Sequence, residues 1–217
     1  MNEQDKIRSH KDKIRIFLIL YYFSESYSDS DYPSRKKIFK SEVRIQKIDF
    51  LLRNPDYFAY ELLNIAIKDD SKKPEIKQII KEIFDKDEPV IRRLEMERFF
   101  FGAYEDIDDV IGFLKSIDFI DFSSKKSSDL KTIEKQYFIT ETAIAKIKNE
   151  ISNFSSLQWY ISRCELIKKY FGNLSGTQLK VSQYQIEEYR DTTYKNYIGS
   201  IKNMVVDDFK KLYNEQL

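Results

Sequence analysis

The sequence has very few of the side chains that form disulfide bonds, zinc sites and catalytic triads. Among its 217 residues there is one cysteine, Cys164, and one histidine, His10. One thiol cannot form an internal disulfide bond, and one Cys with one His cannot supply the ligands of a zinc site. A Ser-His-Asp triad would need His10 as its base, and His10 lies in a polar N-terminal stretch. These absences predict a protein that is not an enzyme and holds no metal or other cofactor.

Glycine, proline and long hydrophobic runs are also scarce. Five Gly and four Pro residues favour long helices with few tight turns. The longest apolar stretch near the start, residues 14–23, is interrupted by Arg15 and is shorter than the roughly 20 residues that span a bilayer. No small-residue cleavage site follows it, and the low thiol content is typical of a reducing compartment. We therefore expect a soluble protein of the cytoplasm.

The charged residues nearly cancel, but they are unevenly distributed along the chain. The sequence has 37 Lys and Arg residues against 36 Asp and Glu residues, a net charge of +1. Residues 35–53 contain seven basic and two acidic residues, a net charge of +5. Residues 82–122 contain five basic and twelve acidic residues, a net charge of −7. Such segments can meet within the molecule or each bind a partner, and the sequence leaves both alternatives open.

The basic segment is predicted to form an amphipathic helix over residues 35–53, with Ser34 as its N-cap. One stripe of this helix is apolar, and another carries cations at steps of four and three residues. The cations of this basic face are Lys36, Lys40, Arg44 and Lys47. Such a face can bind nucleic-acid phosphates or an acidic partner, and a merely solvated face is the alternative.

Most of the remaining chain has apolar residues at helical spacing. The predicted helices cover residues 13–23, 57–67, 74–84, 106–116, 141–151, 157–171, 178–190 and 195–213. The polar residues 24–34 are expected to form a loop. Residues 90–104 fit either a helix that breaks at Gly102 or a strand through residues 99–101.

Residues 116–140 show a different pattern, which is typical of two strands. Residues 116–124 alternate between apolar and polar, residues 125–135 are polar, and residues 136–140 fit a returning strand. Helix, strand, polar loop, strand and helix are the layout of a winged helix. The predicted class is therefore mainly α (α+β). A winged-helix-like core with a two-stranded wing covers residues 1–151, and a C-terminal helical region covers residues 152–217. Lys125 and Lys126, at the expected tip of the wing, are candidates for contact with a DNA backbone.

Three further motifs resemble parts of active sites, and each also has a simpler structural explanation. Residues 172–180, GNLSGTQLK, lack the glycine spacing and lysine of a phosphate-binding loop, and they fit a turn between two helices. Asp56, Glu75 and Lys77 match the residue types of a metal-dependent nuclease, which would place both carboxylates on strands. Here both acids follow a proline that starts a helix, where the helix dipole favours them. The acidic residues 105–109 lack the spacing of a calcium loop.

Trp159 and Cys164 lie on the helix predicted over residues 157–171, and we expect both side chains in the core.

Three segments together resemble one protein family. They are KIDFLLRNPDYFAYELL at residues 47–63, FGAYEDIDDVIGFLKSIDFID at residues 101–121 and FGNLSGTQLK at residues 171–180. In this order and spacing they are similar to the middle components of bacterial ABC three-component conflict systems, a class that includes the small C subunit of the Lamassu anti-phage system. The most specific strings are K-x-D-F-L-L-R-x-P and S-G-x-Q-L-K, and neither is a catalytic motif.

The resemblance implies a non-catalytic accessory subunit of an anti-phage defence complex. Such a subunit bridges an SMC-like ATPase and a nuclease effector, and it helps to hold the effector inactive until foreign DNA is sensed. Its partners would be these two proteins and, through the complex, the DNA backbone. The alternative is a winged-helix DNA-binding transcriptional regulator. In that case residues 106–116 would form the recognition helix, but they are acidic and would repel phosphate.

Overall fold

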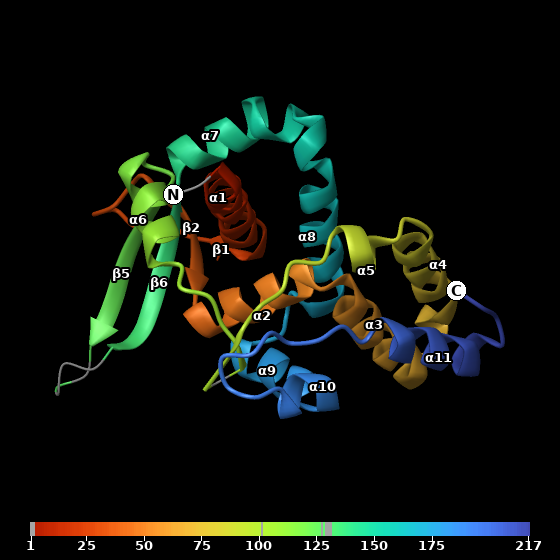
Figure 1. Ribbon diagram of the computed structural model, residues 1–217. Helices are drawn as coiled ribbons and strands as arrows, with labels where there is room; N and C mark the ends of the chain where they lie inside the picture. The colour runs from red at the N-terminus through yellow and green to blue at the C-terminus, as the bar shows by residue number, and fades with distance from the viewer. Residues whose placement is uncertain (1–2, 101, 127, 129–131) are drawn as a thin grey trace. The chain divides into compact units, whose positions relative to one another are not determined.

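The computed structural model describes residues 3–100, 102–126, 128 and 132–217 (Figure 1). It is mainly helical, with one four-stranded and one two-stranded antiparallel sheet, so the predicted α+β class is confirmed. The chain forms two compact units. Unit 1 consists of Met1–Asp49 and Asp106–Leu179, and unit 2 of Phe50–Glu105 and Lys180–Leu217. Residue 151, where the sequence suggested a domain boundary, lies inside unit 1.

Unit 1 combines the larger sheet with four helices. The strands are β1 (Glu25–Ser26), β2 (Arg35–Lys40), β5 (Ile120–Lys126) and β6 (Thr132–Thr140), and their order in the sheet is β1-β2-β6-β5. The helices are α1 (Glu3–Phe23), α6 (Asp108–Ser116), α7 (Glu141–Asn149) and α8 (Gln158–Phe171), with the 3-10 turns η2 (Ile151–Asn153) and η3 (Ser155–Leu157) before α8. Helix α1 packs against α6, α8 and the strands β2 and β6 (Figure 1). Its residues 16–20 are all buried, as the apolar run predicted.

The prediction of a helix over residues 35–53 is wrong for its first third, residues 35–40. Residues 35–40 form strand β2, Ser41 adopts a left-handed conformation with φ 79°, and helix α2 covers Glu42–Arg53. Strand β2 pairs with β6, so that Ile38 lies opposite Phe138 and Phe39 opposite Tyr137. This partner lies about a hundred residues further along the chain, and its ladder overrides the helical pattern of the local sequence.

The two strands predicted over residues 116–124 and 136–140 are confirmed with different bounds: β5 begins four residues later and ends two residues later than expected, and β6 begins four residues earlier. Strand β5 includes Lys125 and Lys126, which lie opposite Glu134 and Thr132 of β6. Both lysines therefore belong to the ladder and not to the loop. Of the turn that joins the strands, residues 127 and 129–131 lie outside the described residues.

Unit 2 consists mainly of helices. They are α3 (Pro55–Lys68), α4 (Lys73–Asp85), α5 (Glu88–Ile91), α10 (Glu187–Asp191) and α11 (Lys202–Tyr213), with the 3-10 turn η1 (Asp70–Lys72) before α4. Helix α9 (Gly176–Tyr184) starts among residues of unit 1 and ends among those of unit 2, as α2 does. Pro55 stands at the first position of α3, as its fixed φ predicted.

Two sequence ambiguities in unit 2 are decided by strand pairing. Residues 98–99 (β3) and 102–103 (β4) form a short hairpin, so this segment contains strands, but the single strand expected through residues 99–101 is interrupted by a turn at Phe100, and residue 101 lies outside the described residues. The segment before α11 pairs with the same hairpin: Arg98 N donates to Asn196 O, and Ile198 N donates to Met96 O. The last helix therefore begins at Lys202 and not near residue 195. The helix predicted over residues 178–190 is likewise divided into α9 and α10.

Within the described residues, no helix has the length and hydropathy needed to cross a membrane.

Candidate functional site

The four cations of the basic face do not share one helix. Lys36 and Lys40 lie on strand β2, while Arg44 and Lys47 lie on helix α2. Lys40 is exposed, and the Lys36 amine lies 3.5 Å from the Glu141 carboxylate. The predicted continuous helical face therefore does not form, because a strand and a helix present their side chains with different periods.

Arg44 and Lys47 are engaged within the protein. Lys47 is only 2% exposed. Arg44 is half-buried, donates to the backbone oxygen of Gly172 and lies over the Phe39 ring. Burial lowers the pKa of the Arg44 guanidinium from its ordinary value. Of the four predicted cations, only Lys36 and Lys40 are therefore placed where a partner can reach them.

The β5 strand contributes one exposed cation to the described surface. Lys126 is exposed at the end of β5, next to the turn. The backbone of Lys125 is paired opposite Glu134, and its side chain lies outside the described part of the structure. A role for either lysine in binding DNA stays a prediction.

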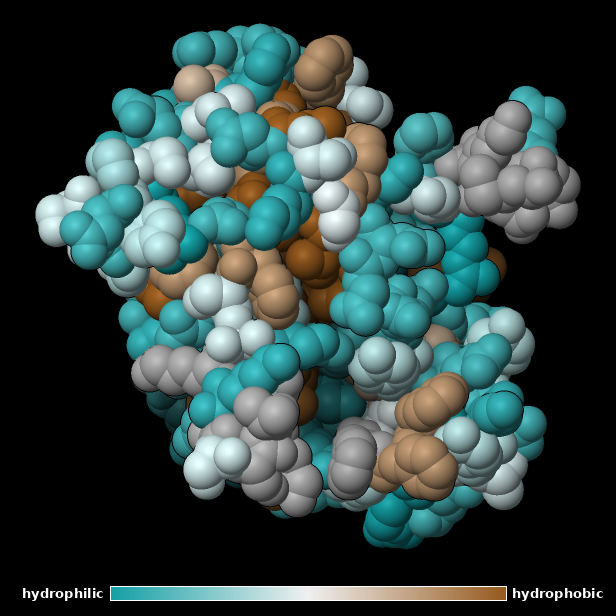
Figure 2. Space-filling model, turned by 90° about the vertical axis from the view of Figure 1, so that its left-hand side faces the viewer, coloured by the Kyte–Doolittle hydropathy of each residue, from teal (hydrophilic) through white to brown (hydrophobic). Residues whose placement is uncertain are grey.

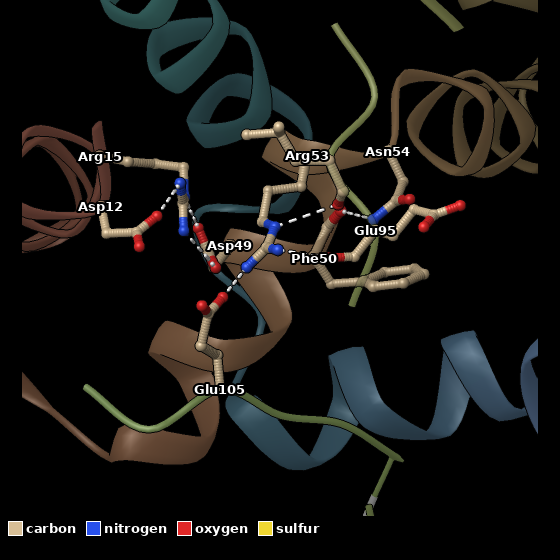
Figure 3. A network of polar contacts seen from close by, with 9 residues as sticks. Asp12, Arg15, Asp49, Phe50, Arg53, Asn54, Glu95 and Glu105 are labelled. Carbon is tan, nitrogen blue, oxygen red and sulfur yellow. Dashed lines mark hydrogen bonds and ion pairs between the residues drawn. The ribbon is translucent and has the colours of Figure 1, made fainter. Parts of the chain in front are cut away.

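The most buried charges of unit 1 form an ion-pair cluster (Figure 3). Arg15 of α1 donates to both carboxylate oxygens of Asp49, and both residues are about 1% exposed. Asp12, one turn earlier on α1, accepts a further hydrogen bond of 2.8 Å from the Arg15 guanidinium. Burial alone would lower the pKa of Arg15. The carboxylates of Asp49 and Asp12 more than reverse this effect, so its pKa lies above the ordinary value.

Unit 2 has its own buried arginine at the end of α2. Arg53 donates to the backbone oxygens of Leu94, at 3.1 Å, and of Glu95, and it forms an ion pair with Glu105. Figure 3 shows its guanidinium directed toward Glu95 and Glu105. A single side chain thus fixes both ends of residues 94–105, the segment that contains the β3–β4 hairpin.

The contacts of individual residues show what the two most specific strings of the resemblance do in this fold. In K-x-D-F-L-L-R-x-P, Asp49 and Arg53 are the buried ion-pair residues, and Pro55 starts α3. In S-G-x-Q-L-K, Ser175 and Gln178 form a reciprocal capping box: Gln178 N donates to Ser175 Oγ, and Ser175 N donates to Gln178 Oε1. A Cβ atom at Gly176 would lie 2.7 Å from the backbone nitrogen of Arg44. Both strings therefore encode packing, and residues 172–180 form the predicted turn between helices.

The two acids of the nuclease alternative, Asp56 and Glu75, lie on helices. Asp56 is buried in the first turn of α3 and accepts hydrogen bonds from Ser200 Oγ and Ile201 N, at 2.6 and 2.8 Å. Glu75 is exposed in the first turn of α4. The nuclease alternative required both on strands, and that requirement is not met. In the part of the chain that the structure describes, no three His, Cys, Asp or Glu residues are grouped for a metal ion.

Two other residues singled out by the sequence lie on α8. Cys164 is fully buried, as predicted, and burial raises the pKa of its thiol, with the charge of Asp49 adding to this effect. Trp159, also expected in the core, is only half-buried and makes an edge contact with the Tyr160 ring. Neither residue is placed as a nucleophile or a ligand platform.

Glu61 in α3 is a buried carboxyl group whose ionisation opposes folding. Ser182 Oγ donates to both of its oxygens, at 2.6 and 2.7 Å, yet burial raises its pKa above the ordinary value. Because the folded state binds this proton more tightly than the unfolded state does, the contribution of Glu61 to stability is lost as the pH rises through its folded pKa.

We therefore expect Glu61→Gln to increase the free energy of unfolding at pH 7, because the amide keeps an acceptor for Ser182 and never ionises. The gain should disappear below the ordinary pKa of a glutamate, where both proteins are neutral at this position. Urea denaturation across this pH range measures the effect. Ser182→Ala serves as the opposite control and should destabilise more at pH 7 than in acid. A Glu61→Gln gain that is independent of pH would contradict this interpretation.

Three segments of unit 1 enclose an apolar groove with a volume of about 380 Å³. One wall is α1, another is the C-terminal half of α6, and the third is residues 151–157. Its principal apolar side chains are Phe17, Leu18, Phe113, Ile117, Phe154 and Leu157. Figure 2 looks at the side of the molecule that carries α6 and the β5–β6 strands, and it shows hydrophobic surface gathered in a hollow among hydrophilic side chains. No feature of the sequence predicted this groove, because its walls are separated by up to about 140 residues.

The rim of the groove is also apolar. Phe113 and Ile117 are 40% and 39% exposed, and Phe154 is 56% exposed. Contiguous exposed apolar surface of this kind is typical of interaction sites. We therefore take the groove as the candidate functional site of unit 1.

Comparisons of the chain with models of protein families, with curated proteins and with solved structures found no significant match.

Proposed function

We propose that this protein is a non-catalytic accessory subunit of an anti-phage defence complex. It bridges an SMC-like ATPase and a nuclease effector and helps to hold the effector inactive until foreign DNA is sensed. The proposal starts from the resemblance of residues 47–63, 101–121 and 171–180 to middle components of ABC three-component systems. On this proposal the protein catalyses no reaction and acts by binding other proteins through its surface.

The element order of unit 1 supports a winged-helix identity for its core. Helix α1, strand β2, helix α2, helix α6 and strands β5 and β6 follow one another, and the sheet order β2-β6-β5 places the first strand beside the last. A winged helix has the same order of helices and strands. The residues of unit 2 that precede α6 then form an insertion between the second and third helices.

The single observation that carries the bridging role is the surface of α6. In a winged helix this third helix is the one that enters the DNA major groove. Here Asp106 just before the helix and Asp108 and Asp109 in its first turn are exposed, and so are Phe113 within it and Ile117 directly after it. Carboxylates repel phosphates, whereas exposed aromatic and aliphatic side chains suit contact with a protein. We infer that the recognition position is used for a protein partner.

The alternative is a winged-helix transcriptional regulator that binds DNA itself. The observation that favours it is the pair of exposed cations Lys40 and Lys126, both on the sheet. Each would contribute a phosphate contact that weakens as the salt concentration rises.

The bridging role predicts that the chain co-purifies with a tagged SMC-like ATPase and with the effector encoded by neighbouring genes. Its addition should suppress cleavage of DNA by the effector. Reversing the charge of the two accessible cations of the basic face, Lys36→Glu with Lys40→Glu, should weaken assembly by about tenfold, or 1.4 kcal/mol. Pull-down and nuclease assays measure both effects.

The matched control is Lys210→Glu with Lys211→Glu, a pair of exposed lysines on α11. This variant should assemble normally. Absence of any complex with the products of neighbouring genes would exclude the bridging role. Sequence-specific DNA binding by the chain alone, lost on charge reversal at Lys40 and Lys126, would favour the regulator.

A further inference from the structure

We propose that the apolar groove of unit 1 binds an amphipathic helix of a partner protein, and that this helix presents a carboxylate to Lys13. The inference deepens the bridging role and rests on it, since it assigns one protein contact to a defined surface. It adds the chemistry of the occupant, which the resemblance does not specify.

The volume and rim of the groove favour a helix over a small molecule. A volume of about 380 Å³ lies at the lower end of the range for small-molecule pockets, about 300–1,000 Å³. A small ligand inside it would leave Phe113, Ile117 and Phe154 on the rim exposed to water. The apolar stripe of a helix covers a groove and its rim together, as in other helix-in-groove complexes.

The walls of the groove also have the right form for a helix. On α1, Ile14, Phe17 and Leu18 lie on one face within about one turn, and Phe113 of α6 and the C-cap residue Ile117 are four residues apart. Two helices that both present apolar residues at this spacing form a channel into which the ridge of a third helix can pack.

The charge at the groove determines whether an acidic or a basic amphipathic helix fits it better. Of the described residues that line the groove, only Lys13 is charged. Its amine lies 4.4 Å from the centroid of the Phe113 ring, at the rim. Among the side chains that the structure describes, no carboxylate forms an ion pair with it. Asp108 and Asp109 lie in the first turn of α6, and neither forms an ion pair with Lys13; Asp108 pairs with Lys135 at 3.8 Å. An occupant that carries Asp or Glu beside its apolar stripe complements Lys13, and a basic one does not.

Two synthetic peptides test the proposal directly. Both have about 18 residues, long enough to form a helix, and both carry leucines at positions i, i+3, i+4 and i+7. One has glutamates beside the leucine stripe, and the other has lysines. We expect the acidic peptide to bind the full-length chain at least about fivefold more tightly than the basic one. Lys13→Glu should reverse this preference, as measured by fluorescence anisotropy.

Substitutions on the rim locate the site. Phe113→Ser and Phe154→Ser should each weaken binding of the acidic peptide by about tenfold, because aromatic anchors dominate such contacts. Val43→Ser is the matched control: Val43 is an equally exposed apolar residue of unit 1 that does not line the groove. Circular dichroism and thermal unfolding verify that each variant is folded.

Several results would overturn the proposal. They are failure of both peptides to bind, equal binding of the two, and binding that Phe113→Ser leaves unchanged. If the parent chain dimerises and Phe113→Ser abolishes the dimer, the occupant is a second copy. If a small apolar dye binds in the groove but neither peptide does, the groove is a small-molecule site. The peptide assay needs neither ATPase nor effector, so its failure is distinct from a failure to assemble with gene neighbours.

Discussion

Replacing Asp49 with alanine is expected to lower the free energy of unfolding by about 3–5 kcal/mol, since it leaves a buried arginine without its main partner. Arg15 and Asp49 are both almost fully buried and are joined through two guanidinium nitrogens. Asp12 keeps one hydrogen bond to Arg15, which places the loss nearer the lower end of that range. Urea denaturation measures the change. For a chain of this length, each kcal/mol also corresponds to about 2–4 °C in Tm.

Two further variants separate the buried charge from the loss of a contact. Glu150→Ala removes an exposed ion pair to Lys146, with an N···O distance of 2.7 Å, and should cost less than about 0.5 kcal/mol. The double variant Arg15→Met with Asp49→Leu removes both charges and should recover most of the loss. If the double variant is as unstable as Asp49→Ala, the cost lies in packing and not in the uncompensated charge.

Replacing Arg53 with alanine is expected to produce a loss of similar size, about 3–5 kcal/mol. This arginine holds two backbone oxygens and the Glu105 carboxylate, and its side chain is 3% exposed. Each buried acceptor left without a donor costs about 1–3 kcal/mol. The effect should be concentrated in residues 92–105, where amide hydrogen exchange should become faster.

Arg53→Lys tests whether the geometry of the guanidinium matters. Lysine keeps the charge but not the planar fork, so it should restore only part of the stability. Arg190→Ala is the control, because that arginine is exposed and pairs with Asp191 at 2.7 Å; its loss should cost less than about 1 kcal/mol. Uniform acceleration of hydrogen exchange throughout the chain would show that Arg53 does not act on this segment alone.

These two arginines also show how far a sequence can predict a site. Arg15 interrupts an apolar run, and Arg53 ends the basic segment of residues 35–53, and the sequence alone assigned a partner to neither. Their carboxylate partners lie 34 and 52 residues further along the chain. Local periodicity contains no information about pairs at that separation, so neither cluster was predicted.

The prediction of a continuous basic face on one helix was wrong for a related reason. Lys36 and Lys40 are in a segment whose spacing fits a helix, and β6 recruits that segment into a sheet. Lys47 satisfies the helical pattern, yet its position on α2 faces the interior. Propensity and spacing describe a segment on its own, and here the partner strand determined the outcome.

What the sequence determined by itself is local. The apolar period of 3.6 residues located most helices, and the period of two over residues 116–124 located β5. Residues 136–140 were recognised as the returning strand β6, and Pro55 and Gly172 marked helix ends that the structure confirms. The scarcity of glycine and proline predicted the helical content. The tertiary structure alone decided which cations are buried, which acids pair with them and where exposed apolar side chains form a groove. These features depend on contacts between residues that are distant in the chain, and only packing brings them together.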